Sequence, residues 1–161
     1  MMRTFEKLSK NINGISMISG NFFIILGLIL IFLEVILRYV FNFGFRWVEE
    51  ITTFSFVYVA FLGSSIVLKE ESHMRIDVFL KMFSERFRSK IELFIAVMII
   101  AFLFVLSYEG IMLVKVGLEA KAPASQISMA LPYFAIPLGS IFMLIQAVNN
   151  FHKRYIVKRI R

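Results

Sequence analysis

The stretch from Asn11 to Leu33, NINGISMISGNFFIILGLILIFL, decides the fold because it contains no charged residue. At a rise of about 1.5 Å per residue, about 20 apolar residues are enough to cross the hydrocarbon core of a bilayer. The stretch reaches that length, and it is too long for the apolar region of a typical signal peptide. It also ends at Glu34 and Arg38 rather than at small residues that suit a signal peptidase. We therefore expect a retained transmembrane helix over residues 12–37.

Three further apolar stretches follow, and each is long enough to form another span. Residues 51–68 and 122–151 carry no charge, and residues 91–114 carry Glu92 and Glu109 near their ends. Pro123 and Pro132 indicate that the last helix begins near Leu131. The 161 residues are 59% hydrophobic, more than a soluble domain of this size can bury. The sequence predicts an all-α integral membrane protein of one domain, 1–161, with spans at about 12–37, 47–68, 91–114 and 131–151.

The basic residues predict the orientation of these four spans. Fourteen of the 18 lysines and arginines lie in the N-terminal segment, in the connection between spans two and three, or in the C-terminal tail. These three segments fall on one side of the membrane if the spans alternate in direction. Because cytoplasmic segments are enriched in Lys and Arg, both termini are expected to be cytoplasmic. The same distribution accounts for the net charge of +7 without a nucleic-acid partner.

The connection between spans two and three has the pattern of an amphipathic helix. Apolar residues recur at helical spacing over residues 75–90, and charged residues occupy the opposite face. A helix of this kind lies in the membrane interface with its basic side toward anionic headgroups. We therefore expect an interfacial helix on the cytoplasmic side, in contact with the lipid bilayer.

Glu34 and Arg38 are the first candidate functional residues. They are four residues apart, so they share one face of a helix and can form an ion pair. A carboxylate within a span can also couple transport to protons, and Glu34 could then serve an autonomous small proton-coupled exporter. We favour the ion pair because both residues lie at the end of the helix and not at the membrane centre.

A second group of candidates begins span two. Phe41, Phe43, Phe45 and Trp47 form an aromatic cluster of the kind that favours the headgroup level. Arg46, Glu49 and Glu50 stand in or beside the first helical turn, where the helix dipole favours negative charge. Two interpretations remain open for these charges: contact with a polar partner outside the membrane, or capping and neutralisation of the helix start.

The remaining residues give little support to catalysis or to metal binding. His73 and Asp77 can approach one another on a helix, but two ligands without a third favour a structural contact over a metal site. There is no cysteine, and no nucleophile elbow, phosphate-binding loop or HExxH motif is present. Gly63, beside two serines, offers a surface that another membrane helix can approach closely. We expect neither an enzyme nor a bound cofactor, and we expect apolar helices that pack against another membrane protein or lipid.

Five short motifs occur in order along the chain: EVILRY at 34–39, RWVEE at 46–50, FLGS at 61–64, HMRID at 73–77 and LPYFAIPLG at 131–139. Together with four basic-inside spans, they resemble the small, Q-type membrane subunit of tripartite ATP-independent periplasmic (TRAP) transporters. The third span adds almost nothing to the resemblance.

The resemblance implies a scaffold role in the bacterial cytoplasmic membrane. Such a subunit packs beside a large membrane subunit that carries the substrate and sodium sites. A periplasmic binding protein delivers an organic acid, such as a C4-dicarboxylate or sialic acid. By position, Trp47, Glu49 and Glu50 would fix the outer end of span two, and His73 and Asp77 would stabilise the cytoplasmic turn. The resemblance also implies that Pro132, Pro137 and Gly139 would shape span four.

Overall fold

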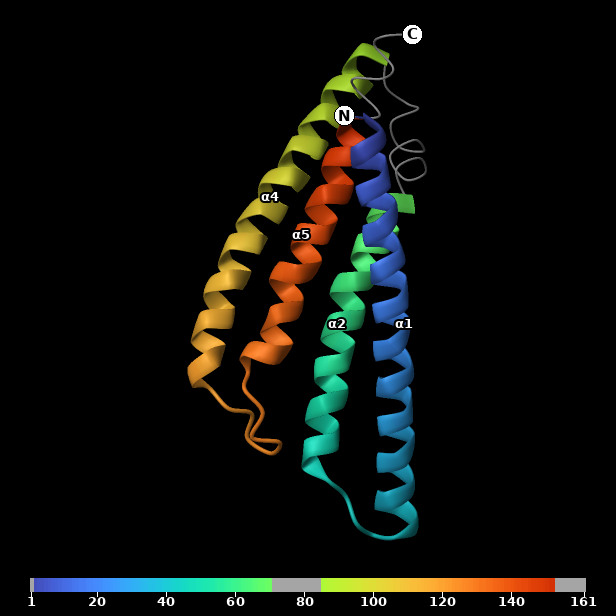
Figure 1. Cartoon of the computed structure of the whole chain (residues 1–161), viewed down its shortest axis with the longest axis vertical. Helices are drawn as coiled ribbons and strands as arrows, with labels where there is room; N and C mark the ends of the chain where they lie inside the picture. Colours follow the sequence, from blue (N-terminus) through green and yellow to red (C-terminus); the bar gives the residue numbers. More distant parts are fainter. Residues whose placement is uncertain (1, 71–84, 153–161) are drawn as a thin grey trace.

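The computed structural model describes residues 2–70 and 85–152, which form four long helices (Figure 1). They are α1 (Met2–Val40), α2 (Arg46–Glu70), α4 (Glu85–Glu119) and α5 (Ala130–His152). Each contains a window long and apolar enough to cross a membrane. The prediction of four long apolar helices is therefore confirmed.

α2 and α5 end within two residues of the predicted spans, whereas α1 and α4 are longer than predicted. α1 has 39 residues and α4 has 35. At about 1.5 Å per residue, α1 is about 58 Å long, roughly twice the thickness of the hydrocarbon core. Hydropathy predicts only the part of a helix that lies in lipid. The polar residues at the ends of these two helices contain no proline, so the helix can continue through them. Both helices consequently continue beyond the apolar segments that predicted them.

Part of the predicted interfacial helix lies outside the described residues. Residues 71–84 are not described, and they include His73 and Asp77. Residues 85–90, assigned to the end of the interfacial helix, form the first turns of α4. The interfacial helix over residues 75–84 stays a prediction.

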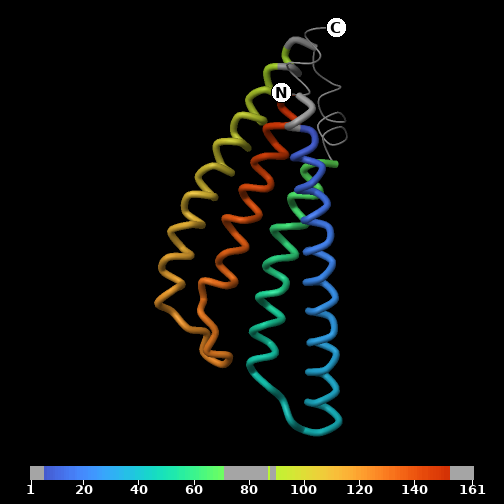
Figure 2. The backbone as a smooth tube through the Cα atoms, viewed as in Figure 1, coloured from blue at the N-terminus to red at the C-terminus, as the bar shows by residue number. Residues whose placement is uncertain are grey.

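The helices pack in a row in the order α4, α5, α2, α1 (Figures 1 and 2). A smaller contact joins α1 to α5. Consecutive helices run in opposite directions, so the start of α1 and the end of α5 lie at the same end of the molecule. The α1–α2 and α4–α5 connections lie at the other end, which we call the two-loop end.

Small residues of α1 lie against larger side chains of α2. A Cβ at Gly20 would lie 4.0 Å from Cβ of Leu62, and one at Gly27 would lie 3.4 Å from the Phe56 ring. The buried positions of α1 recur every three to seven residues and include Ser16, Gly20 and Gly27. Those of α2 include Thr52, Ser55 and Ser65. In membranes, small residues at such spacing let two helix backbones approach closely. Small residues are therefore frequent among the buried positions of both helices.

Tyr58 connects three helices near the middle of the row. Its ring stacks on Phe23 of α1 with centroids 4.4 Å apart, and its hydroxyl donates to the Leu131 carbonyl of α5 at 2.7 Å. Tyr58, Leu62 and Ala135 are buried together as the centre of the apolar core. A buried tyrosine needs a partner for its hydroxyl, and the start of α5 supplies one.

Glycines let α5 pack closely against both of its neighbours. A Cβ atom at Gly139 would lie 2.5 Å from Cβ of Phe61 on α2, which leaves no room for a side chain. On α4, a Cβ at Gly117 would lie 2.7 Å from the Ala130 nitrogen. α5 also runs as one helix through Pro137, whose ring lies against Gly110. α5 is therefore the element around which the row is assembled.

A cluster of polar side chains joins α1 to α5 at the end opposite the two loops. Ser9 and Gln146 are both buried. The Ser9 hydroxyl donates to the side-chain oxygen of Gln146, and the side-chain amide of Gln146 donates to the backbone carbonyl of Ser9 at 3.0 Å. The Asn149 amide donates to the Ser9 hydroxyl at 3.2 Å. Away from water, these hydrogen bonds satisfy groups that would otherwise be costly to bury. They fix the contact between α1 and α5.

Candidate functional site: the two-loop end

The connection between α1 and α2 turns at a residue in the left-handed region. Asn42 has a φ of 52°, and the Phe43 amide donates to the Leu37 carbonyl at 3.0 Å. Asparagine is one of the few non-glycine residues that visit this region readily. The chain therefore reverses within the short segment between Val40 and Arg46.

Glu34 holds this connection from inside the fold. Its side chain is buried; one carboxylate oxygen accepts from Arg38 at 2.7 Å and the other from the Phe45 amide at 3.3 Å. Gly44 lies against it, since a Cβ there would be 3.1 Å from Oε1 of Glu34. The pair of Glu34 and Arg38 expected from their spacing is thus present, and it also binds the loop backbone.

Arg38 extends the contact to α2. The same guanidinium nitrogen, Nη2, also donates to Oε1 of Glu49. Arg38 is half exposed and Glu34 is buried, so one end of the network meets solvent and the other does not. Charge-assisted hydrogen bonds are roughly twice as strong as neutral ones. The result is a clamp of Glu34, Arg38 and Glu49 across the α1–α2 hairpin.

The connection between α4 and α5 folds back on itself as a short hairpin. The Ala122 amide donates to the Ile127 carbonyl at 2.8 Å, and the Met129 amide donates to the Ala120 carbonyl at 2.9 Å. Gln126 adopts a positive φ of 58° at its tip. Ser128 then accepts from the Ala130 amide at the start of α5. The backbone hydrogen bonds within the segment give it a defined shape.

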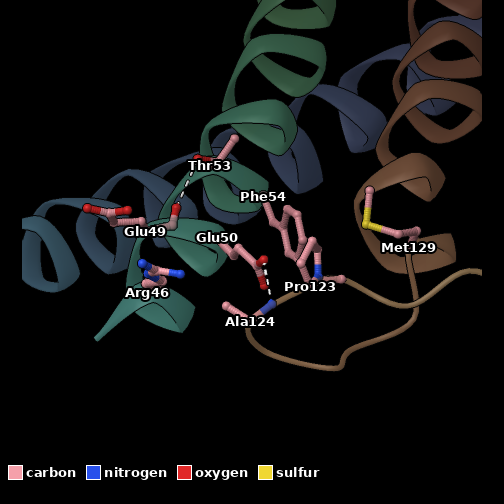
Figure 3. A pocket seen from close by; sticks show the side chains of 9 residues that line it. Arg46, Glu49, Glu50, Thr53, Phe54, Pro123, Ala124 and Met129 are labelled. Carbon is pink, nitrogen blue, oxygen red and sulfur yellow. Dashed lines mark hydrogen bonds between the residues drawn. The ribbon is translucent and has the colours of Figure 1, made fainter. Parts of the chain in front are cut away.

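Glu50 fastens this second loop to α2. Its two carboxylate oxygens accept from the amides of Ala124 and Ser125 at 2.8 and 2.7 Å, and Figure 3 draws the first of these contacts. Pro123, just before them, has no amide hydrogen to offer. One side chain therefore satisfies two neighbouring backbone donors. Glu50 joins the α1–α2 half of the molecule to the α4–α5 half at the two-loop end.

An open groove of about 530 Å³ lies between the start of α2 and this loop (Figure 3). Arg46, Thr53 and Phe54 line it on the helix side, and Pro123 and Met129 line it on the loop side. Glu49 pairs with Arg38, and Glu50 accepts from the amides of the α4–α5 loop. Arg46 is exposed, and within residues 2–70 and 85–152 it takes part in no ion pair. The groove thus presents one arginine, unpaired within the described residues, beside two glutamates, Glu49 and Glu50, that are held by other groups.

Three of the four residues of the expected aromatic cluster are in contact, whereas Phe41 is exposed and makes no ring contact with the described residues. The rings of Phe43 and Phe45 meet edge to face with centroids 4.7 Å apart, and Trp47 follows at 5.8 Å from Phe45. Trp47 is 42% exposed. Aromatic rings at the end of an apolar helix suit the headgroup level of a bilayer.

Comparison with known proteins decides the class. Residues 27–155 match the family "Tripartite ATP-independent periplasmic transporters, DctQ component". The chain belongs to this family. It is a multi-pass protein of the inner membrane and a small permease subunit of a TRAP transporter. Members of the DctQ family are components of transporters, and the family is not an enzyme family.

Two relatives from Haemophilus influenzae are named as small permease proteins of TRAP transporters. One is 27% identical over 87% of this chain and 82% of its own length, and the other is 34% identical over 71% of each. SiaT of the same species, the sialic acid TRAP transporter permease, is 28% identical over 82% of this chain but only 22% of its own length. DctMQ of Oleidesulfovibrio alaskensis, the isethionate permease, is 22% identical over 65% of this chain and 17% of its own. A DctQ component therefore also occurs as part of a longer permease, which supports a large membrane partner.

Sequence reasoning found some contacts of this DctQ subunit and missed others. It found Glu34 with Arg38 because they are four residues apart on one helix. It missed the bond from Arg38 to Glu49, and the bonds from Glu50 to the loop, because these join residues 11 and about 75 positions apart. The position of Glu49 and Glu50 at the start of a helix was compatible with a polar partner, but their spacing did not show which residues that partner would be. Gln146 and Asn149 were also missed, since the stretch around them carries no charge.

The described part of this DctQ subunit holds no group of three or more His, Cys, Asp or Glu side chains placed to bind a metal ion. The candidates Pro132, Pro137 and Gly139 all lie buried in α5. Gly63 lies on α2 with nothing within 4 Å of the position a Cβ would take. Gly63 was predicted to let another membrane helix approach closely. No helix in the described part of this chain does so.

Replacement of Glu50 by Ala should free the α4–α5 loop from α2. The two amides of Ala124 and Ser125 lose their acceptors, so the loop opens locally while the helices stay folded. Trypsin cleavage after Lys121 in the detergent-solubilised protein is expected to accelerate about tenfold, which corresponds to about 1.4 kcal/mol of lost local stability. Glu119→Ala, an exposed change just before the loop, is the control. An equal cleavage rate in both variants would show that Glu50 does not hold the loop.

Proposed function

We propose that this DctQ subunit is the scaffold of a sodium-coupled, binding-protein-dependent TRAP transporter that imports an organic acid. The observation that carries the proposal is the family match over residues 27–155. The relatives SiaT and DctMQ are named for sialic acid and isethionate, both organic anions. A C4-dicarboxylate or a sialic acid is the substrate class we propose here.

The placement of polar side chains supports a scaffold role rather than a transport site in this chain. A transport site near the membrane centre uses broken helices and polar groups that face a cavity. In the described residues, all four helices run without a break, and Glu34 is engaged with Arg38 and the Phe45 amide. Sodium and solute would accordingly bind to the large membrane subunit, and this chain would hold that subunit in place.

We propose that the two-loop end faces the periplasm and that both termini are cytoplasmic. The distribution of Lys and Arg supports this orientation, since 14 of the 18 fall on the side of the termini. The aromatic cluster would then lie at the periplasmic headgroup level. The cytoplasmic side, including the proposed interfacial helix and the turn held by His73 and Asp77, would face anionic lipid.

This orientation places Arg46, Trp47, Glu49 and Glu50 where a periplasmic binding protein arrives. Glu49 and Glu50 already hold the two loops, so their proposed role is to fix the shape of that surface. Arg46 holds neither loop, and it is left for the large membrane subunit rather than for the binding protein. In this arrangement the binding protein would meet a rigid surface rather than two independent loops.

Co-expression with a large TRAP permease subunit tests the proposal. The tagged chain should carry the large subunit through purification in mild detergent, and deletion of the chain should abolish uptake by the complex. If the two never co-purify and uptake survives the deletion, the chain is not a subunit of that transporter.

Glu34→Gln separates this proposal from an autonomous proton-coupled exporter. A scaffold that carries this substitution should still support uptake when it assembles with the large subunit, because the proposed role of Glu34 is to hold the α1–α2 hairpin and not to carry protons. An exporter that depends on Glu34 would instead lose proton-coupled transport by the purified chain alone. Proton-dependent transport by the wild-type chain alone, lost in the variant, would replace the scaffold with the exporter.

A further inference from the structure

One face of α2 is not covered by the other described helices. α2 lies between α1 and α5 and packs against both (Figure 1). Its exposed residues within the span are spaced three or four apart, so they form one stripe along the helix. We call this surface the α2 stripe, defined by the half-buried Gly63 together with five exposed residues: Thr53, Phe56, Ala60, Ser64 and Val67.

The α2 stripe differs in side-chain size from the exposed faces of α1 and α4. Those faces present large apolar side chains that suit contact with acyl chains, among them Phe22, Ile25, Phe32, Phe94, Phe102 and Phe104. The middle of the stripe presents Ala60, Gly63 and Ser64 instead. The Ser64 hydroxyl donates to the Ala60 carbonyl at 2.7 Å, so it leaves no unmet donor. A flat surface of small residues lets another helix backbone approach closely, whereas lipid gains nothing from it.

A second observation lies beside the stripe, in a groove between α1 and α2. The groove has a volume of about 270 Å³ and is lined by Glu34, Thr52 and Phe56 among others. Thr52 is only 6% exposed, and its hydroxyl has no hydrogen-bond partner in the described part of the chain. A buried hydroxyl without a partner is costly in an apolar solvent. The groove therefore suits a polar side chain that reaches Thr52 from outside this chain.

Charge at the two-loop end of the same face points to the chemistry of the partner. Arg46 lies in the larger groove on the α5 side of α2, and Thr53 and Glu49 line both grooves. Its guanidinium takes part in no ion pair within the described residues. Glu49 and Glu50 lie in the same groove but are held by Arg38 and by the loop. A carboxylate at the periplasmic end of a partner helix would give Arg46 the ion pair that it lacks in the described part of the chain, and charge-assisted pairs of this kind fix the position of a helix.

We propose that the α2 stripe is the surface on which a transmembrane helix of the large permease subunit packs. That helix brings a carboxylate toward Arg46 and a hydrogen-bonding side chain toward Thr52, and its backbone approaches Ala60, Gly63 and Ser64. This inference rests on the proposed function, which supplies the large subunit. It adds which side of the row the subunit occupies and leaves the outer faces of α1 and α4 to lipid.

Single-cysteine variants test the surface without disturbing it. The chain has no cysteine, so Ala60→Cys and Ala101→Cys each place one spin label, on the α2 stripe and on α4 respectively. Both alanines are exposed and lie within spans. Oxygen accessibility of each label is measured in the purified chain and again after assembly with the large subunit. We expect accessibility to fall at position 60 on assembly and to stay unchanged at position 101.

The outcomes separate the inference from the proposed function. Protection at position 101 alone, or at neither position in an assembled complex, overturns the inference and leaves the scaffold role intact. Protection at position 60 before the large subunit is added assigns the stripe to a second copy of this chain and also overturns it. Failure of the unlabelled wild-type chain to assemble with the large subunit overturns the proposed function itself.

Bulky substitutions give a second measurement. Ala60→Leu should lower the amount of large subunit that co-purifies about tenfold, as expected for one overpacked contact between helices. Ala101→Leu, the matched change on α4, should leave it unchanged. Circular dichroism and the elution volume of the isolated chain check that both variants fold. Equal co-purification of the two folded variants would contradict the assignment of the stripe.

Discussion

Gly139→Ala should strongly destabilise the packing of α5 on α2. The new Cβ would lie 2.5 Å from Cβ of Phe61 and 3.1 Å from its backbone carbonyl carbon and oxygen. Because backbone atoms cannot swing aside, the two helices must separate. Overpacking of this kind costs about 1–3 kcal/mol, and backbone contacts favour the upper end of that range.

Titration of the purified protein from mild detergent into SDS, followed by circular dichroism, measures this loss as a lower midpoint of unfolding. Gly63→Ala is the matched control, since it adds the same methyl group to a helix where nothing lies within 4 Å. Alanine is also the better helix former by about 1 kcal/mol, so the control should be neutral or slightly stabilising. Equal midpoints for the two variants would show that α2 and α5 are not in close contact at Gly139.

Replacement of Glu34 by Gln should loosen the α1–α2 hairpin by about 1–3 kcal/mol, because one of the two acceptor oxygens becomes an NH2 group that cannot accept from Arg38 or from the Phe45 amide. Gln has the same size as Glu, so no cavity contributes. Arg38 keeps Glu49 as a partner, but the Phe45 amide loses a charged acceptor. The measurement is again the midpoint of unfolding in SDS.

Glu109→Gln supplies the control for the change of charge, because Glu109 is an exposed residue on α4. An exposed substitution of this kind should stay within about 0.5 kcal/mol of the wild type. A double-mutant cycle with Arg38→Gln isolates the pair itself, and a coupling of about 0.5–3 kcal/mol is expected for residues in contact. A coupling of zero would remove Glu34 from the clamp that joins α1 and α2.

The sequence predicted the helices well because a membrane helix needs only a long run of apolar residues. It predicted their lengths less well, since hydropathy reports the lipid-embedded part and α1 and α4 continue past it. The Glu34–Arg38 pair was predicted because both residues belong to one helical turn. The partners of Glu49 and Glu50 were not, because those contacts depend on how separate helices are placed.

The order of helices in the row could not be predicted for a related reason. Each helix is apolar around most of its circumference, so no single polar face shows which side meets its neighbour. The decisive contacts are steric instead: Gly139 against Phe61, and Gly117 against Ala130. The sequence alone does not show whether a neighbouring helix occupies the space beside a glycine, as at Gly139, or leaves it empty, as at Gly63.

This chain crosses the membrane, and we propose that its partner moves the solute. Reconstitution into proteoliposomes tests it most directly: this chain alone, the large subunit alone, and the two together, each with the periplasmic binding protein and an inward sodium gradient. We expect uptake of the organic acid only when both membrane subunits are present. Solute transport by this chain alone, whether driven by sodium or by protons, would contradict it.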